Sequence, residues 1–248
     1  MLHWPWLLIG ALSLPVAAQT LSLRTVQQSG SLVKYDPDGN PLKPGLCMEV
    51  MRAVQKLDPG LSFTGQQQHV PLRRVERLLS EGQIDVFFCL LRTTERERQW
   101  RFAPVPLYTI RHVVVQRSED TRPVDTLGDL AALSHGQPVL VMRGTALAQR
   151  LKMAEVTITE VGSEREALQM LALGRTDAIY GQDINLLRHI KEARLDNRLK
   201  LGRTVFMEEA QFLALRADLP AADEERLTQA LRKLERDGTL RHLAEKYR

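Results

Sequence analysis

Arginines crowd the segment that follows the apolar run at residues 84–90. This segment, 91–101, reads LRTTERERQWR and contains four arginines interleaved with two glutamates. A guanidinium presents a planar pair of donors that matches a carboxylate, so such a residue in a closed cleft would bind an anion. The same arginines could instead form a solvated helix face and pair with the glutamates beside them. The residues alone favour the solvated helix face.

A second candidate anion site lies at Gly144 and Thr145, where an apolar strand at 139–142 gives way to an expected helix. The free backbone N–H groups and the dipole of a helix start favour an anion there. Arg143, the preceding residue, could reach across to the same ligand. The alternative is an ordinary helix cap, in which Thr145 binds its own first turn.

The sequence gives less support to catalytic or metal chemistry. The candidates for a general acid or base are Asp183, Glu95, His69 and His112. No Ser-His-Asp constellation accompanies them, and no spacing typical of metal ligands occurs. We therefore expect no catalytic residue, no metal and no cofactor.

The N-terminus predicts a secretory signal peptide. Residues 1–18 contain no Lys, Arg, Asp or Glu, and their apolar stretch ends in small residues. This pattern indicates cleavage between Ala18 and Gln19. Because the run is shorter than the roughly 20 residues of a membrane-spanning helix, we expect a soluble periplasmic protein.

The composition is that of an ordinary folded protein. Of the 248 residues, 44% are hydrophobic and 26% are charged, which argues against disordered and collagen-like chains. The 34 Lys and Arg exceed the 30 Asp and Glu by +4, a mild positive charge for this length. We therefore expect no nucleic-acid partner.

Strands and helices alternate along the mature chain, which predicts an α/β fold. Apolar spacing predicts strands at 21–26, 61–64, 84–90, 113–115, 139–142, 156–161 and 177–180, and helices at 46–57, 72–79, 164–173 and from 220 onward. A turn at 36–40 predicts a short hairpin between 32–35 and Leu42. The similar strings SEGQIDVFF (80–88) and ALGRTDAIY (172–180) indicate two α/β lobes rather than one sheet.

Five segments in order resemble the extracytoplasmic solute-binding proteins of bacterial family 3, the polar-amino-acid-binding components of ABC importers. They read DPDGNPLKPGLCMEVMRAV, LLSEGQIDVFFCLLRTTERERQWRFAPVPLY, VMRGTALAQ, ALQMLALGRTDAIYGQ and ALRKLERDGTLRHLAEKYR. The resemblance covers essentially the whole mature chain and implies a two-lobed, type II (Venus-flytrap) periplasmic-binding-protein fold with two hinge strands. Lobe 1 would comprise 19–107 and 209–248, and lobe 2 would comprise 112–205. The ligand would bind in the cleft between them.

The resemblance also implies a carboxylate clamp in lobe 1. The family's Thr-x-x-Arg pattern matches Thr93 and Arg96, which makes Arg96 the expected anchor of a ligand carboxylate. Leu91 stands where the family has a carboxylate-binding Ser or Thr, and a leucine side chain cannot donate a hydrogen bond.

In lobe 2, the family's Gly-Thr anion loop matches Gly144 and Thr145. The family's ammonium-binding Asp matches Asp183 when counted from Asp177, and Gln182 when counted from the shared Asp-Ala core. A neutral Gln there would remove the charge partner of a zwitterion. An amino acid, a dicarboxylate and another organic anion therefore stay open as ligands.

The two cysteines, Cys47 and Cys89, are either a disulfide or two small buried side chains. On the implied fold, Cys47 begins the first helix and Cys89 lies on a neighbouring strand, both at the cleft edge of lobe 1. A disulfide between them is feasible if their Cα atoms approach within about 7 Å.

The function that this resemblance implies is capture of a small, carboxylate-bearing polar solute by a monomer, for an ABC permease or a membrane sensor. One alternative is a secreted enzyme on the same scaffold, such as a cyclohexadienyl dehydratase-like lyase. Another is an interaction module that has lost its ligand.

Overall fold

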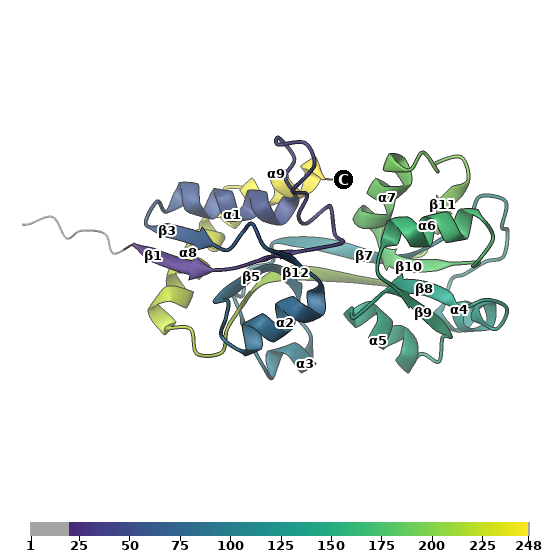
Figure 1. Cartoon of the computed structure of the whole chain (residues 1–248), viewed down its shortest axis with the longest axis horizontal. Helices are drawn as coiled ribbons and strands as arrows, with labels where there is room; N and C mark the ends of the chain where they lie inside the picture. Colours follow the sequence, from purple (N-terminus) through teal and green to yellow (C-terminus); the bar gives the residue numbers. More distant parts are fainter. Residues whose placement is uncertain (1–19, 248) are drawn as a thin grey trace, which may run out of the picture.

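The computed structural model describes residues 20–247 and places its helices and strands in two lobes (Figure 1). The expected signal peptide and its cleavage point after Ala18 lie outside the described residues. Within the range 20–247, no helix is both long and apolar enough to cross a membrane. The same range holds no group of three or more His, Cys, Asp or Glu side chains that could bind a metal ion.

Two long strands run between the lobes. Strands β7 (Tyr108–Arg117) and β12 (Met207–Leu215) pair antiparallel, with Met207 opposite His112. Beyond this shared ladder, β7 pairs with strands of the second lobe and β12 pairs with strands of the first (Figure 1). One sheet therefore continues through both lobes in the order β5-β12-β7-β10-β8-β9. A ladder of this kind lets two lobes bend toward each other.

The first lobe combines both ends of the chain. Its strands are β1 (Leu21–Arg24), β2 (Gln27–Gln28), β3 (Leu61–Thr64), β4 (His69–Val70), β5 (Val86–Leu91) and β6 (Arg101–Phe102). Its helices are α1 (Leu46–Leu57), α2 (Leu72–Ser80), α3 (Thr94–Glu97), α8 (Ala221–Arg236) and α9 (Thr239–Lys246). Strand β5 is buried along its whole length, as its unbroken apolar sequence predicts. Helix α1 packs its apolar face against α8 and α9.

The second lobe positions three helix starts at one sheet edge. It contains α4 (Leu127–Ser134), β8 (Val139–Met142), α5 (Ala146–Met153), β9 (Ile158–Val161), α6 (Glu164–Ala172), β10 (Ile179–Gln182), α7 (Asp183–Glu192) and β11 (Leu199–Leu201). Strand β8 pairs in parallel with both β9 and β10. The carboxyl ends of these strands, and the helices that follow them, therefore meet at a common edge, where open α/β sheets bind ligands.

The expected hairpin at 32–42 is wrong. Residues 31–44 contain turns but no strand. The backbone N–H of Leu46 donates to the Val33 carbonyl at 2.7 Å, and that of Cys47 donates to the Lys34 carbonyl at 3.1 Å. These bonds tie the loop to the start of α1, and within the loop the Asp36 N–H donates to the Pro44 carbonyl at 2.8 Å without forming a strand pair. The loop lies between the lobes.

Cys47 and Cys89 form a disulfide, with their Cα atoms 6.0 Å apart. Cys89 has a φ of 65°, and the register of β5 against β12 shifts beside it, which marks a β-bulge. The carbonyl groups of this bulge face the 31–36 loop. The Tyr35 hydroxyl donates to the Phe88 carbonyl at 2.8 Å, and Lys34 donates to the Cys89 carbonyl at the same distance.

Candidate functional site

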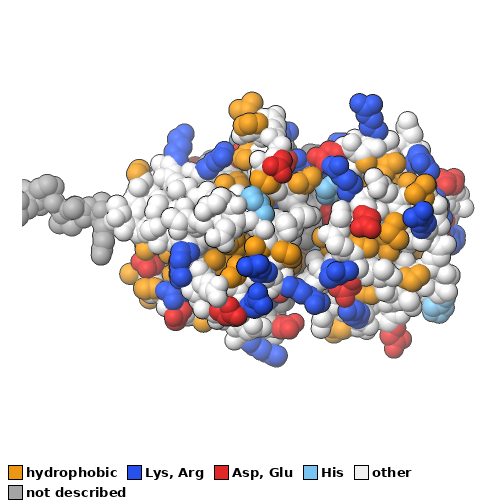
Figure 2. Space-filling view, in the orientation of Figure 1, with side chains coloured by type: hydrophobic (Ala, Val, Ile, Leu, Met, Phe, Trp, Pro, Cys, Tyr) orange, Lys and Arg blue, Asp and Glu red, His pale blue; other side chains and the backbone are white. Residues whose placement is uncertain are grey.

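A cavity of about 230 Å³ lies between the lobes and is lined by both. We call it the Lys34 cavity. Ser31 and Lys34 line it from the first lobe, and Glu164, Gln182 and Asn185 line it from the second. Basic side chains gather on both sides of the boundary between the lobes (Figure 2). The cavity thus has the position expected for a ligand in a two-lobed fold.

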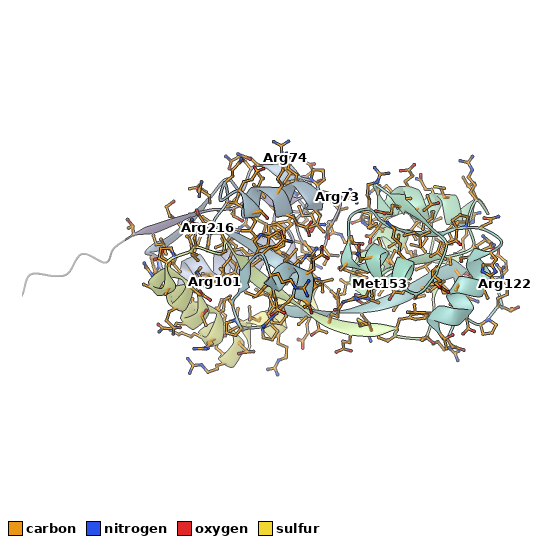
Figure 3. The ribbon with its side chains drawn as sticks, turned by 90° about the horizontal axis from the view of Figure 1, so that it is seen from below. Arg73, Arg74, Arg101, Arg122, Met153 and Arg216 are labelled. Atoms are coloured by element: carbon orange, nitrogen blue, oxygen red, sulfur yellow. A yellow bond between two sulfur atoms is a disulfide. The ribbon has the colours of Figure 1, made fainter. Side chains whose placement is uncertain are left out.

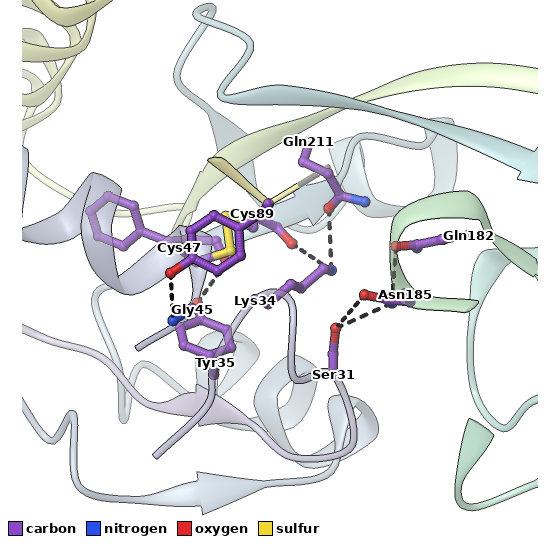
Figure 4. The surroundings of a disulfide bond; sticks show 11 residues. Ser31, Lys34, Tyr35, Gly45, Cys47, Cys89, Gln182, Asn185 and Gln211 are labelled. Atoms are coloured by element: carbon purple, nitrogen blue, oxygen red, sulfur yellow. Dashed lines mark hydrogen bonds between the residues drawn. A yellow bond between two sulfur atoms is a disulfide. The ribbon is translucent and has the colours of Figure 1, made fainter. Parts of the chain in front are cut away.

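Lys34 places an ammonium group in this cavity although only 5% of the residue is exposed. Its Nζ donates to the carbonyl oxygen of Cys89 at 2.8 Å and to Oε1 of Gln211 at 3.3 Å (Figure 4). Burial, reinforced by the positive charge of Arg96, lowers the pKa of Lys34 to about 7. The bulge at Cys89 is what supplies the carbonyl that holds this cation. Lys34 was not identified from the sequence, because it falls in the hairpin expected at 32–35, where a lysine ordinarily faces water.

Glu164 is the first residue of α6 and lines the same cavity with 5% exposure. Its Oε2 is buried and has no hydrogen-bond partner among the described residues. Nε2 of His189 lies 3.6 Å from Oε2, and burial lowers the pKa of that imidazole. Burial raises the pKa of Glu164 to about 8, against the opposing effect of Lys34. Glu164 was also not identified from the sequence, since its neighbours suggest only an acidic first helical turn.

The structure separates Gln182 from Asp183. Gln182 ends β10 and lines the Lys34 cavity, where its Oε1 accepts from Nδ2 of Asn185 at 3.4 Å. Asp183 is buried outside the cavity lining and binds Arg111, through the backbone N–H at 3.1 Å and Nε at 2.8 Å. The group that this strand end presents to the cavity is therefore a neutral amide.

Arg96 binds a carboxylate of the protein itself. Its Nη2 and Nε lie 2.6 Å and 3.0 Å from Oε1 of Glu76 on α2, and its Nη1 donates to the Leu91 carbonyl at 2.9 Å. Thr93 accepts the backbone N–H of Arg96 at 3.3 Å and caps the short helix α3. Leu91 ends β5 and is buried.

Arg96 and Thr93 line a second hollow of about 770 Å³ between α2, α3 and α5, which we call the Arg96 cavity. Arg73 and Thr145 line both cavities. Arg73 lies at the boundary of the lobes (Figure 3), and a Cβ placed on Gly144 would approach its Cγ to 2.8 Å. Glycine at position 144, whose φ is 71°, thus lets the Arg73 side chain approach the second lobe.

The Gly144–Thr145 turn likewise carries an internal anion. The backbone N–H of Gly144 donates to Oε2 of Glu160 at 2.9 Å, and Lys152 binds Oε1 of the same carboxylate at 2.6 Å. These contacts hold the pKa of Glu160 below its ordinary range. Thr145 donates to the Met142 carbonyl and accepts from the third residue of α5, as a helix cap does. Arg143 lines the Lys34 cavity.

Contacts between the loop and α7 join the lobes. Arg188 of α7 donates from Nη1 to the Leu32 carbonyl at 2.8 Å, and its Nη2 is paired with the buried carboxylate of Asp36. Ser31 and Asn185 are hydrogen-bonded across the same boundary at 3.3 Å (Figure 4). The described structure therefore has its cleft closed on this side.

The four candidate acid–base residues are spread over the molecule. His69 contacts Gln27, Asp183 pairs with Arg111 as described above, and Glu95 lines the Arg96 cavity. His112 is buried, with Nε2 3.2 Å from Glu209 and Nδ1 3.3 Å from the Tyr180 hydroxyl. None of the four is among the residues that line the Lys34 cavity in the described range.

Comparisons of the sequence with known proteins find a matching family and a related protein. The model of the family described as bacterial extracellular solute-binding proteins, family 3, matches residues 33–248. The probable amino-acid-binding protein YxeM of Bacillus subtilis (strain 168) is 25% identical over 213 residues, which cover 82% of this chain and 75% of YxeM.

Two solved structures give the fold. A histidine kinase sensor domain with similarity to periplasmic binding proteins has a TM-score of 0.77 at 19% identity, covering 93% of this chain and 97% of that one. A mutant of ArgBP from T. maritima has a TM-score of 0.75 at 20% identity, covering 91% and 94%. The expected type II periplasmic-binding-protein fold is confirmed.

Proposed function

Because the chain belongs to the bacterial extracellular solute-binding proteins of family 3, we propose that it captures a small polar solute between its two lobes in the periplasm. The observation that carries this proposal is the Lys34 cavity, whose charged and amide groups come from both lobes. A solute that contacts both walls is held only when the lobes are together, so its binding energy favours closure.

The solute class that we propose is an amino acid or a related carboxylate-bearing molecule. YxeM, which is named as a probable amino-acid-binding protein, is similar to this chain in sequence. ArgBP is similar to it in fold. A cavity of about 230 Å³ lies below the roughly 300–1,000 Å³ of sites for drug-sized ligands. This size favours a metabolite of few atoms over a peptide or an oligosaccharide.

Export and delivery complete the proposal. Removal of residues 1–18 would release a mature chain beginning at Gln19 into the periplasm. The closed lobes would then present the solute, from a monomer, to an ABC permease or to a membrane sensor. Both receivers fit the comparisons, since one similar structure is the sensor domain of a histidine kinase and another is the substrate-binding protein of an amino acid ABC transporter.

The test is a thermal-shift screen of the mature protein against amino acids and organic acids, with each hit repeated by titration calorimetry. A solute that raises the melting temperature and is recovered unchanged supports a binding protein. Conversion of a hit would instead identify an enzyme on this scaffold. A screen without any hit would contradict the proposal.

A ligand-free interaction module is the second candidate, and one observation favours it. Both expected anion sites hold carboxylates of the chain itself, Glu76 on Arg96 and Glu160 on the Gly144 N–H. A protein that has lost its solute would have no need to keep these groups free. This candidate predicts the empty screen described above.

A further inference from the structure

The groups expected to bind a solute carboxylate are engaged within the protein. Glu76 lies on the Arg96 guanidinium at 2.6 Å, and Glu160 lies on the Gly144 N–H at 2.9 Å. A solute carboxylate at either place would have to displace a carboxylate that is already charge-paired. The charge recognition of a solute therefore needs other groups in the cleft.

One N–H bond of the Lys34 ammonium group has no acceptor among the described residues. An ammonium group carries three N–H bonds, and the hydrogen bonds within the described structure use two of them, to Cys89 and Gln211. Both acceptors are uncharged, so the positive charge itself has no counter-ion bonded to it among the described residues. A buried cation in this state gains from an anion that enters the cavity.

Glu164, in contrast, has an acceptor oxygen that lacks a hydrogen-bond donor among the described residues. No hydrogen bond within the described residues reaches its carboxyl group, and its Oε2 is enclosed. An enclosed acceptor without a partner is unfavourable, so a donor from a solute would remove that penalty. Nε2 of His189 lies 3.6 Å from this oxygen, which is beyond hydrogen-bond distance.

The two groups face one cavity from opposite lobes and do not pair with each other. Lys34 belongs to the loop of the first lobe and Glu164 to the first turn of α6 in the second, and both line the same 230 Å³ cavity. A molecule with opposite charges at its two ends would give the Lys34 ammonium an anion and the ionised form of Glu164 a cation, so its binding would favour the charged state of both groups. It would also connect the lobes, which neither a simple anion nor a simple cation would do.

The rest of the lining limits the solute further. Leu72, Leu147 and Val161 give apolar walls suited to a short aliphatic chain. Tyr180 is the sole aromatic residue among the described lining residues, whereas recognition of a quaternary ammonium uses a cage of several rings. This lining disfavours a quaternary ammonium and suits a primary amine, which can donate hydrogen bonds to a carboxyl group.

We propose, as an extension of the function proposed above, that Lys34 and Glu164 recognise the two ends of a short aliphatic zwitterion. Its carboxylate lies on Lys34 and its primary ammonium lies on Glu164, while the amides of Gln182 and Asn185 contact its flank. Arg96 pairs with Glu76 inside the first lobe and does not touch the solute.

The test uses probes with one carbon skeleton. The wild-type mature protein is titrated with 2-, 3- and 4-aminobutyrate, with butyrate, which lacks the ammonium, and with butylamine, which lacks the carboxylate. At least one aminobutyrate isomer should bind, and it should bind at least 10-fold more tightly than butyrate and butylamine. Equal affinity for butyrate or butylamine would overturn the proposal without any variant having been made.

Variants then assign the two ends. Lys34→Met and Glu164→Gln should each weaken binding of that isomer at least 10-fold, whereas Arg96→Met should not. The matched controls are Lys43→Met, in the same loop region, and Glu166→Gln, two residues further along α6. Both residues are exposed, and both variants should leave affinity unchanged. Loss of binding in Arg96→Met, with Lys34→Met and Glu164→Gln unaffected, would overturn the assignment.

Failure of this proposal is distinct from failure of the proposed function. If no aminobutyrate binds but another solute of the broader screen does, the zwitterion assignment falls and the solute-binding function stands. If neither set contains a ligand, both fall together.

Discussion

The guanidinium of Arg96 holds the carboxylate of Glu76, with Nη2 2.6 Å from Oε1. The residues lie on α3 and α2 of the same lobe, and the Arg96 side chain is only 9% exposed. The geometry suits an arginine that binds a carboxylate, as the sequence predicts, but the carboxylate belongs to the chain. A charged partner buried in this way is costly to remove, because the remaining charge loses its compensation.

Glu76→Gln should therefore destabilise the protein. It leaves the Arg96 guanidinium buried against a neutral amide, and we expect a loss of about 2 kcal/mol in the free energy of unfolding, moderated by the partial exposure of Glu76. Urea unfolding measures it. Glu81→Gln, at the residue that follows the same helix, is the control, since Glu81 and Arg77 are both exposed and 4.0 Å apart. Its effect should stay within about 0.5 kcal/mol. Equal stability of the two variants would contradict the role given to Glu76.

The disulfide yields a prediction that couples stability to the site. The oxidised mature protein should have no alkylatable thiol, as measured by mass spectrometry, and two free thiols would refute the bond. Replacing Cys47 and Cys89 together by serine should lower the free energy of unfolding by about 2–4 kcal/mol. Affinity for the solute should fall as well, because the Cys89 carbonyl positions Lys34.

The ion pair of Asp36 with Arg188 should favour the closed cleft. Asp36 lies on the loop of the first lobe and Arg188 on α7 of the second. Asp36→Asn removes the charge attraction, so the closed form should be less populated and solute affinity should fall at least about 5-fold. Small-angle scattering of the solute-free variant should give a larger radius of gyration than wild type. Lys191→Gln, at an exposed position of α7, should change neither quantity. An unchanged radius of gyration in Asp36→Asn would show that the Asp36–Arg188 ion pair does not favour the closed cleft.

The fold was largely predictable because apolar periodicity marks its elements. The buried strand at 86–91 and the helix at 46–57 follow from unbroken or helically spaced apolar residues. The 31–44 loop was not predictable in this way. Its turn residues match a hairpin equally well, and its actual path depends on bonds to α1 and on an ion pair with Arg188, far away in sequence.

Part of the Lys34 cavity was predictable, since Arg143, Thr145 and Gln182 of the expected site residues line it. The sequence indicates Arg96 and Gly144 as groups that bind a solute anion, whereas in the structure each binds a carboxylate of the protein. That these come from Glu76 and Glu160 depends on how α2 and β9 pack, which no local pattern records. Lys34 and Glu164 were not predicted as site residues, because a lysine in a polar loop and a glutamate in a first helical turn ordinarily face water.

Burial of Glu164 should make stability depend on pH. Its pKa is raised from the ordinary 4.5 to about 8, so between these values the folded state binds more protons than the unfolded state. The stabilisation that Glu164 contributes is thus complete below about pH 4.5 and is lost as pH rises toward 8, with a slope of at most about 1.4 kcal/mol per pH unit.

Glu164→Gln isolates this effect, since the amide resembles the protonated acid and does not titrate. The groups that face Glu164, Lys34 across the cavity and His189 on α7, titrate in both proteins and largely cancel in the difference. Denaturant unfolding should show wild type losing stability relative to Glu164→Gln from pH 5 to pH 8. Glu166→Gln, measured against wild type in the same way, should give a difference independent of pH. A constant difference for Glu164→Gln would mean that the carboxyl group is ionised in the folded protein at pH 7, and hence that a cation or donor already compensates it without any solute.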